Sequence, residues 1–360
     1  MSTPAGVIRF VGEDPADGSA PRTFTFESLA PEPLGYEALA AASPNRPVSV
    51  SLKWRGAKVV AFDIPDAEID APCTVTGHLE SPFTARAIGL VKGGWLPSIF
   101  ASLDASTIVL LDRNVVSEII GRFEGGVLRG RDPDFIDLFA ELPVRLNPMP
   151  FVLEGNARVL PTAQAVQAQL AEVVTKLGAA LPQAQLVVGP RSAAAAKGLI
   201  EEGRVWFESH TAFLLGAADV MPGSVSRARM ETAWRGILAS ADQAGVSRRS
   251  IVLLAVLSAL TSQNGIGPAR DLLKLRRDYG ATDAYNALSD LRAIEILINL
   301  LALYPDQPVQ FCTADRALAL FWVGMGIHNP RRAGGGTMVD FDLHPALLPD
   351  WAAVFWRDAR

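Results

Sequence analysis

The stretch STIVLLDRNVVSEIIGRF, from Ser106 to Phe123, sets the fold class of the chain. Its first part, STIVLL, is a short continuous apolar run that leads into an aspartate, Asp112. Such a run is typical of a strand buried on both faces of a parallel sheet. The second part, NVVSEIIGRF, has its apolar residues at helical spacing. A strand that leads at once into a helix is the repeating unit of open α/β sheets, and it predicts that fold class here.

A second strand-and-helix unit lies near the other end of the chain. PVQFCTAD (308–315) is a buried-type strand that ends at Asp315, and RALALFWVGM (316–325) has helical spacing. LVVG (186–189) is a further candidate strand. Between the two units, helical spacing extends over residues 162–181, 226–244, 250–262 and 284–304. Alternation of strands and helices predicts an α/β domain over residues 101–360 with a mainly parallel sheet.

Residues 1–100 have a different character. The short β-type runs PVSVSLKW and KVVAFDI are separated by turns rich in Pro, Gly, Asp and Ala, and CTVTGHL alternates as a half-buried strand does. This region is predicted to be a small, β-rich accessory module. It carries no recognisable chemistry, and we expect that it could offer a surface to a protein partner.

Four carboxylates stand out in the α/β region. Asp112 and Asp315 follow predicted strands, and the reactive cleft of an open parallel sheet lies outside the carboxyl ends of its strands. Glu154 ends the apolar run of PMPFVLEGNARVL, and Asp290 lies in a helix that is apolar nearly all round. Each acid also has an ordinary explanation. Asp112 and Asp315 could cap helices, Glu154 could be an exposed loop residue, and Asp290 could favour a helix dipole.

Together, these acids suggest a site for a hard divalent cation. Carboxylate oxygens hold Mg²⁺ or Mn²⁺, and bound cations can activate a water and stabilise the leaving oxygen of a phosphodiester. No nucleophilic serine or cysteine is then needed. The four histidines, His78, His210, His328 and His344, are scattered, so a zinc site is not expected.

Three segments resemble the PIN family of metal-dependent nucleases over residues 106 to about 330. IVLLDRNVVSEI is similar to the first strand of that family with its Asp-x-Asn turn at Asp112 and Asn114, and PFVLEGNAR to the segment that carries its glutamate. SDLRAIEILINLLALYP and VQFCTADRALALFW are similar to its last helix and strand, with acids at Asp290 and Asp315 and a Thr-x-Asp from Thr313.

The resemblance implies a three-layer α/β/α fold and hydrolysis of RNA with Mg²⁺ or Mn²⁺. By this resemblance the chain is an endoribonuclease whose metal-binding carboxylates are Asp112, Glu154, Asp290 and Asp315, oriented by Asn114 and Thr313. Small PIN domains are much shorter, so residues of about 190–280 are expected to be a helical insertion. The long separation of Glu154 from Asp290 leaves Glu208 as a rival for the glutamate position.

The most basic part of the chain is a candidate surface for RNA phosphates. Residues 226–277 are rich in arginine, and Arg248, Arg249, Arg276 and Arg277 are the predicted substrate contacts. The alternative is a set of solvated helix faces.

Composition limits the remaining possibilities. A formal net charge of −5 argues against a protein that coats nucleic acid by bulk charge, but it is compatible with a local basic patch. Cys73 and Cys312 lack metal-site spacing, the N-terminus lacks the apolar core of a signal peptide, and no apolar run reaches membrane-spanning length. We therefore expect a cytoplasmic protein with no membrane contact. Two other functions remain open: a catalytically silent PIN-like scaffold that binds RNA or protein, and a different metal-dependent phosphohydrolase.

Overall fold

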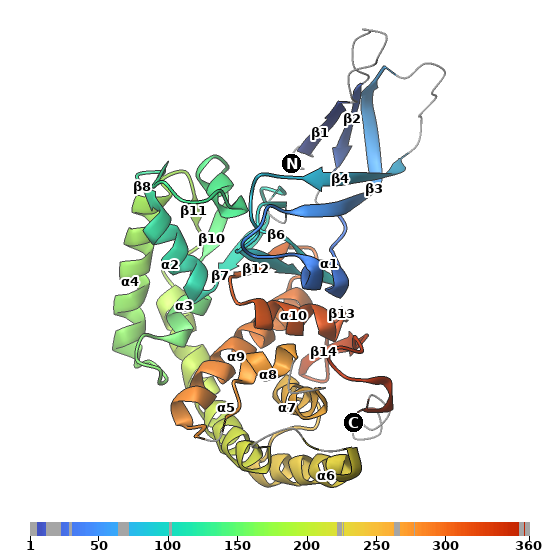
Figure 1. Ribbon diagram of the computed structural model, residues 1–360. Helices are drawn as coiled ribbons and strands as arrows, with labels where there is room; N and C mark the ends of the chain where they lie inside the picture. The colour runs from blue at the N-terminus through green and yellow to red at the C-terminus, as the bar shows by residue number, and fades with distance from the viewer. Residues whose placement is uncertain are drawn as a thin grey trace.

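The computed structural model describes residues 6–11, 23–28, 31–63, 72–100, 103–221, 225, 227–262, 267–276, 278–352 and 356. The chain is a mixed α/β protein with an antiparallel β module at its N-terminal end, as predicted (Figure 1). Within the described residues, none of the helices combines the length and apolar character of a membrane span.

A six-stranded sheet forms the centre of the molecule, in the order β11-β10-β7-β12-β5-β6. β7, β10, β11 and β12 run parallel, whereas the hairpin β5–β6 joins β12 in the antiparallel sense. The strands are β5 (Ile88–Val91), β6 (Gly94–Pro97), β7 (Ile108–Leu111), β10 (Arg145–Asn147), β11 (Gln185–Leu186) and β12 (Val309–Thr313). The predicted parallel sheet is therefore a mixed sheet with a parallel core. Its β5–β6 edge comes from residues that we expected in the N-terminal module.

Helices pack on both faces of this sheet. The α-helices are α1 (Tyr36–Ala41), α2 (Arg113–Arg122), α3 (Met149–Glu154), α4 (Ala163–Ala180), α5 (Ser192–Val220), α6 (Arg227–Ala244), α7 (Ile251–Thr261), α8 (Pro268–Leu273), α9 (Ala281–Leu303) and α10 (Arg316–Met325). A 3-10 helix, η2, spans Phe135–Ala140. Two small hairpins complete the list, β8 (Phe123–Glu124) with β9 (Val127–Leu128), and β13 (Ile327–Ala333) with β14 (Gly336–Phe341).

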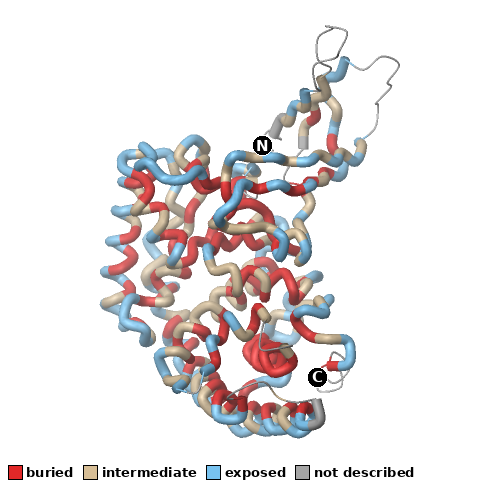
Figure 2. Tube along the Cα trace, viewed as in Figure 1, coloured by how far each residue is buried: buried red, intermediate tan, exposed pale blue. Residues whose placement is uncertain are grey.

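The side chains of β7 show how the sheet separates two cores. Val109 and Leu111 pack into a core with α2, α3 and α4, while Leu110 points the other way into a core formed with α5 to α10. This alternation follows from the two-residue period of a strand. Both faces are apolar because both are covered. Figure 2 shows buried residues running through the centre of the molecule, and α7 is buried over its whole length.

The N-terminal module is a four-stranded antiparallel sheet, in the order β1-β2-β3-β4. Its strands are β1 (Gly6–Val11), β2 (Thr23–Ser28), β3 (Ser49–Phe62) and β4 (Cys73–Glu80). The two runs predicted as separate strands are one long strand, β3. The chain continues because Gly56 adopts φ +65°, where the register with β4 shifts, so the glycine makes a bulge and not a turn.

The segment of about 190–280, expected to be a helical insertion, begins with a long helix whose bounds the sequence did not indicate. Helix α5 has 29 residues and fills much of the segment expected to be an insertion. Its three glycines, Gly198, Gly203 and Gly216, interrupt the helical pattern. It packs against α6 and α9, and α9 and α10 contact the sheet on this side.

Candidate functional site

The predicted strand-end aspartates lie at the point where the order of the sheet reverses. From β7 the chain moves to β10 and then β11 on one side, and it later returns to place β12 on the other side. Ligands of open α/β sheets bind at such a reversal, outside the carboxyl ends of the strands. Asp112 follows β7 and Asp315 follows β12 by two residues, so both emerge there.

Thr313 connects the two aspartates. Its hydroxyl donates a hydrogen bond to Oδ2 of Asp112 at 2.7 Å and accepts one from the backbone N–H of Asp315 at 3.0 Å. Both aspartates also cap helices, as the alternative interpretation expected. Asp112 accepts from the N–H of Arg113 at the start of α2, and Asp315 from that of Leu318 in α10. Capping fixes the position of each carboxyl group without using all of its lone pairs.

Burial raises the pKa of Asp112, and the nearby charge of Asp315 adds to the rise. The hydrogen bonds from Thr313 and from the backbone of Arg113 act in the opposite direction. Asp112 is 6% exposed. The carboxylate is therefore kept in a poorly solvated place close to a second acid, where a cation would stabilise it.

Asp290 joins this group from α9. Burial raises its pKa well above the usual value, and the charges of Asp112, Asp315 and Glu154 raise it further. Among the residues that the structure describes, no side chain or backbone group donates a hydrogen bond to the Asp290 carboxyl group. Asp290 is half-buried, so its carboxyl oxygens are open to water or to a cation.

Glu154 is the last residue of α3 and forms an ion pair with Arg113, with 2.8 Å between its Oε1 and the arginine Nε. Burial raises its pKa to about 7 and outweighs the attraction of Arg113, while the charge of Asp112 raises it further. Its backbone carbonyl accepts a hydrogen bond of 2.5 Å from Tyr285 on α9. The residue is thus part of the site and not an exposed loop acid.

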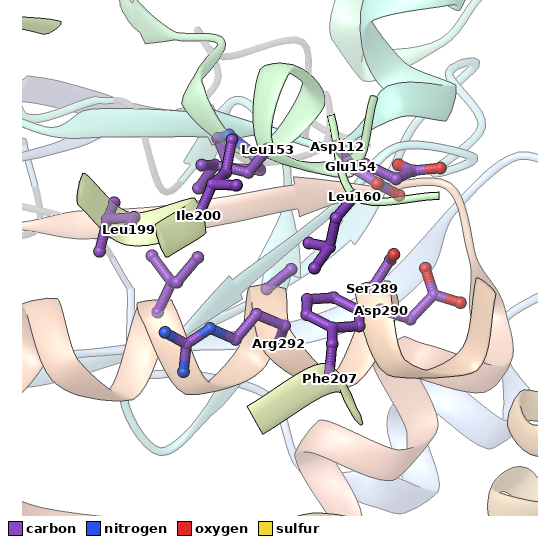
Figure 3. A pocket seen from close by; sticks show the side chains of 13 residues that line it. Asp112, Leu153, Glu154, Leu160, Leu199, Ile200, Phe207, Ser289, Asp290 and Arg292 are labelled. Carbon is purple, nitrogen blue, oxygen red and sulfur yellow. The ribbon is translucent and has the colours of Figure 1, made fainter. Parts of the chain in front are cut away.

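Three of the four acids line one small cavity, which we call the acid cavity. Its volume is about 30 Å³, and it is lined by Asp112, Pro150, Leu153, Glu154, Leu160, Leu199, Ile200, Phe207, Ser289, Asp290, Arg292, Ala293 and Ile296. Figure 3 shows Asp112 and Glu154 on one side and Asp290 on the other, with Arg292 pointing away from the acids. This volume admits a water-sized ligand and not a mononucleotide, so the observation that would favour a closed-pocket phosphohydrolase is not met.

The donor types fit Mg²⁺ or Mn²⁺, because the group consists of carboxylate oxygens and Asp290 has no competing donor among the described residues. The spacing is not that of a closed metal cage. Within the described part of the chain, no three His, Cys, Asp or Glu side chains are arranged to hold a metal ion. Glu154 is not free to act as a metal ligand in this arrangement, because its carboxylate is paired with Arg113.

The other predicted residues lie apart from the acid cavity. Asn114 is exposed on α2, and Glu208 is exposed on α5, where it lines a different cavity. Arg248 pairs with Asp242 at 2.7 Å, and Arg249 lines a groove beside β14.

At the end of the basic segment, Arg276 pairs with Asp283 at 3.0 Å. Arg277 lies outside the described residues. From this segment, Lys274 is the residue whose charge reaches the site, since it lowers the pKa of Asp290.

No motif in the sequence indicates the contacts of Arg113 and Tyr285. Arg113 is next to Asp112, and that adjacency was the only available signal. Both residues contact Glu154 or its backbone across long sequence separations.

Comparison of the chain with protein-family models, with curated proteins and with solved structures finds no match.

Proposed function

We propose that this chain is a metal-dependent nuclease, an endoribonuclease of the PIN-like class that uses Mg²⁺ or Mn²⁺. One observation carries the proposal: four acids lie near the reversal point of the sheet, Asp112, Glu154, Asp290 and Asp315. The charges of the other three raise the pKa of Asp290. The order β11-β10-β7-β12 with helices on both faces supports a three-layer PIN-like domain.

The residues of the chain would act on the substrate in distinct ways. Asp112, Asp290 and Asp315 would hold the cation, and Thr313 would keep Asp112 oriented toward it. When bound, a cation supplies an activated water and stabilises the leaving oxygen of a phosphodiester. Glu154 would complete the set of carboxylates around the cation, and in the metal-free protein Arg113 holds it.

A cleavage assay tests this proposal. Circular single-stranded RNA should be cut in the presence of Mg²⁺ or Mn²⁺, and EDTA should stop the reaction; a circular substrate requires an internal cut. Asp112→Asn and Asp315→Asn should each reduce the cleavage rate by more than roughly 100-fold. Loss of a residue that only hydrogen-bonds to a metal ligand costs up to about that much, and loss of the ligand itself should cost more. Asp306→Asn, an exposed acid just before β12, is the matched control and should retain the native rate. Metal-dependent cleavage that persists in both site variants would refute the assignment.

A catalytically silent PIN-like scaffold is the second candidate, and one observation favours it. Glu154 is neutralised by Arg113, and the described acids do not form a ready metal cage. Such a protein would bind RNA equally well with EDTA or Mn²⁺ and would leave the RNA intact.

A further inference from the structure

The guanidinium of Arg113 is fixed on the turn that carries Glu154. Its Nε pairs with Glu154 Oε1 at 2.8 Å, one terminal nitrogen donates to Asn156 Oδ1 at 2.8 Å, and the other donates to the carbonyl of Gly155. The guanidinium also lies 4.9 Å from the ring centre of Phe151. All three nitrogens are thus used within one short segment at the end of α3.

Arg113 holds a special position among the cations of the site. Of the described Lys and Arg side chains, it alone is within ion-pair distance of any of the four acids, although Lys274 acts on Asp290 through its field. It is the residue after Asp112, so its charge also stabilises that carboxylate. The arginine therefore supplies part of the positive charge that the crowded acids need.

Glu154 is at the same time an acid of the cavity. It lines the cavity with Asp112 and Asp290, and its charge acts on Asp290. One oxygen, Oε1, is held by Arg113 at a distance typical of a charged hydrogen bond. A cation that uses Glu154 as a ligand must draw this carboxylate away from the arginine or share it.

We propose that Arg113 is the resident counter-charge of the acid cavity, and that a divalent cation and the Arg113 guanidinium compete for the Glu154 carboxylate. This inference rests on the proposed metal-dependent function. In the metal-free protein, Arg113 neutralises one of four acids and holds the turn after α3. When a cation binds, Glu154 turns to it, and the guanidinium is left at the site with its charge free to meet an anionic group.

The test is a measurement of Mn²⁺ affinity on the full chain by electron paramagnetic resonance, which follows free Mn²⁺ and needs no catalysis. Arg113→Met removes the competitor and keeps much of the side-chain length. It should lower the Kd for Mn²⁺ by roughly fivefold or more, as expected for loss of a partly solvated charge pair. Arg129→Met, which breaks an exposed ion pair with Glu124, is the matched control and should leave the Kd unchanged.

Two further variants separate competition from other effects. Arg113→Lys keeps the charge but cannot reach all three acceptors, so its Kd should lie between those of the native protein and Arg113→Met. In a Glu154→Gln background, Arg113→Met should lower the Kd by much less than it does in the native background, because only the field of Arg113 at Asp112 is then removed. Melting curves without metal establish that each variant is folded.

The outcomes distinguish this proposal from the function on which it rests. If the native protein binds Mn²⁺ and Arg113→Met binds it no more tightly, Arg113 does not compete, and only this proposal fails. An equal gain with and without Glu154 would likewise overturn it. If neither the native protein nor Arg113→Met binds Mn²⁺, the metal-dependent function fails as well.

Discussion

Helix α2 carries buried charge at both of its ends, and the two ends accommodate it differently. At the C-terminal end, Arg122 is fully buried and donates to both oxygens of Asp137, to Glu118 and to the carbonyl of Asp132. At the N-terminal end, Asp112 and three other acids share one visible ion pair, between Arg113 and Glu154. The charged groups at the C-terminal end of α2 form a complete hydrogen-bond network, whereas the carboxylates at the N-terminal end have oxygen lone pairs that accept no hydrogen bond from the residues that the structure describes.

A raised pKa occurs at both ends of α2, so it does not distinguish the structural acids from the acids of the candidate site. Burial raises the pKa of Asp134, which lies beside the Arg122 network, just as it raises that of Asp112. Asp134 nevertheless accepts hydrogen bonds from Thr84 at 2.7 Å and from the backbone N–H groups of Arg86 and Ile136. Asp290 has no such donor among the described residues. A count of donors, and not a shifted pKa alone, distinguishes a structural acid from a candidate ligand.

The largest expected effect on the free energy of unfolding comes from the Arg122 network at the C-terminal end of α2. Arg122→Met leaves Asp137 buried without its cation, and loss of one partner of a buried pair costs about 3–5 kcal/mol of the free energy of unfolding. Urea denaturation measures this loss, and Arg129→Met, at an exposed pair, should cost less than about 1 kcal/mol. If Arg122→Met costs no more than Arg129→Met, the Arg122 network is not the structural support described here.

A pH titration tests the acid end. Folded Glu154 releases its proton at about pH 7, whereas an unfolded glutamate does so near its ordinary value of 4.5. The folded chain binds more protons between these values, so Glu154 makes the free energy of unfolding fall as pH rises from 4.5 through 7. The loss is at most about 3 kcal/mol. Glu154→Gln should flatten this part of the profile, and an unchanged slope would show that Glu154 is not desolvated in the folded state.

The smallest expected effect comes from a comparison of Asp290, near the N-terminal end of α2, with Asp137, near its C-terminal end. Asp290→Asn removes a repelled charge and no hydrogen bond, so without metal at pH 8 it should leave the free energy of unfolding equal or raise it by about 1 kcal/mol. Asp137→Asn changes the same atoms but breaks the pair with Arg122, and it should lower the free energy of unfolding. Equal losses in the two variants would remove the distinction between the ends.

The main elements of the fold could be predicted because their signals are local. The apolar runs before Asp112 and Asp315 define β7 and β12, and the helix predicted over 316–325 is α10 with the same bounds. Parallel strands with acids at their carboxyl ends bring those acids to one edge. The hydroxyl of Thr313 bonds to the carboxylate of Asp112 and to the backbone of Asp315, while its orienting role stays a prediction.

The remaining features depend on contacts that a linear pattern does not contain. The partner of Arg113 lies 41 positions along the chain on a different helix, and whether they meet depends on how α3 packs against α2. The pattern does not locate helix α5 because three glycines weaken it, whereas packing against α3, α4, α6 and α9 stabilises the helix. The composition of the basic segment predicts a surface for phosphates, but Arg248 and Arg276 are paired with acids of the chain.

The most direct test of the central claim is the anomalous scattering of Mn²⁺ in crystals of the full chain soaked with MnCl₂. We predict a peak within ligand distance of Asp112, Asp290 and Asp315, and its loss in crystals of Asp112→Asn. A map with no peak at these residues, or with the peak unchanged in Asp112→Asn, would contradict the account.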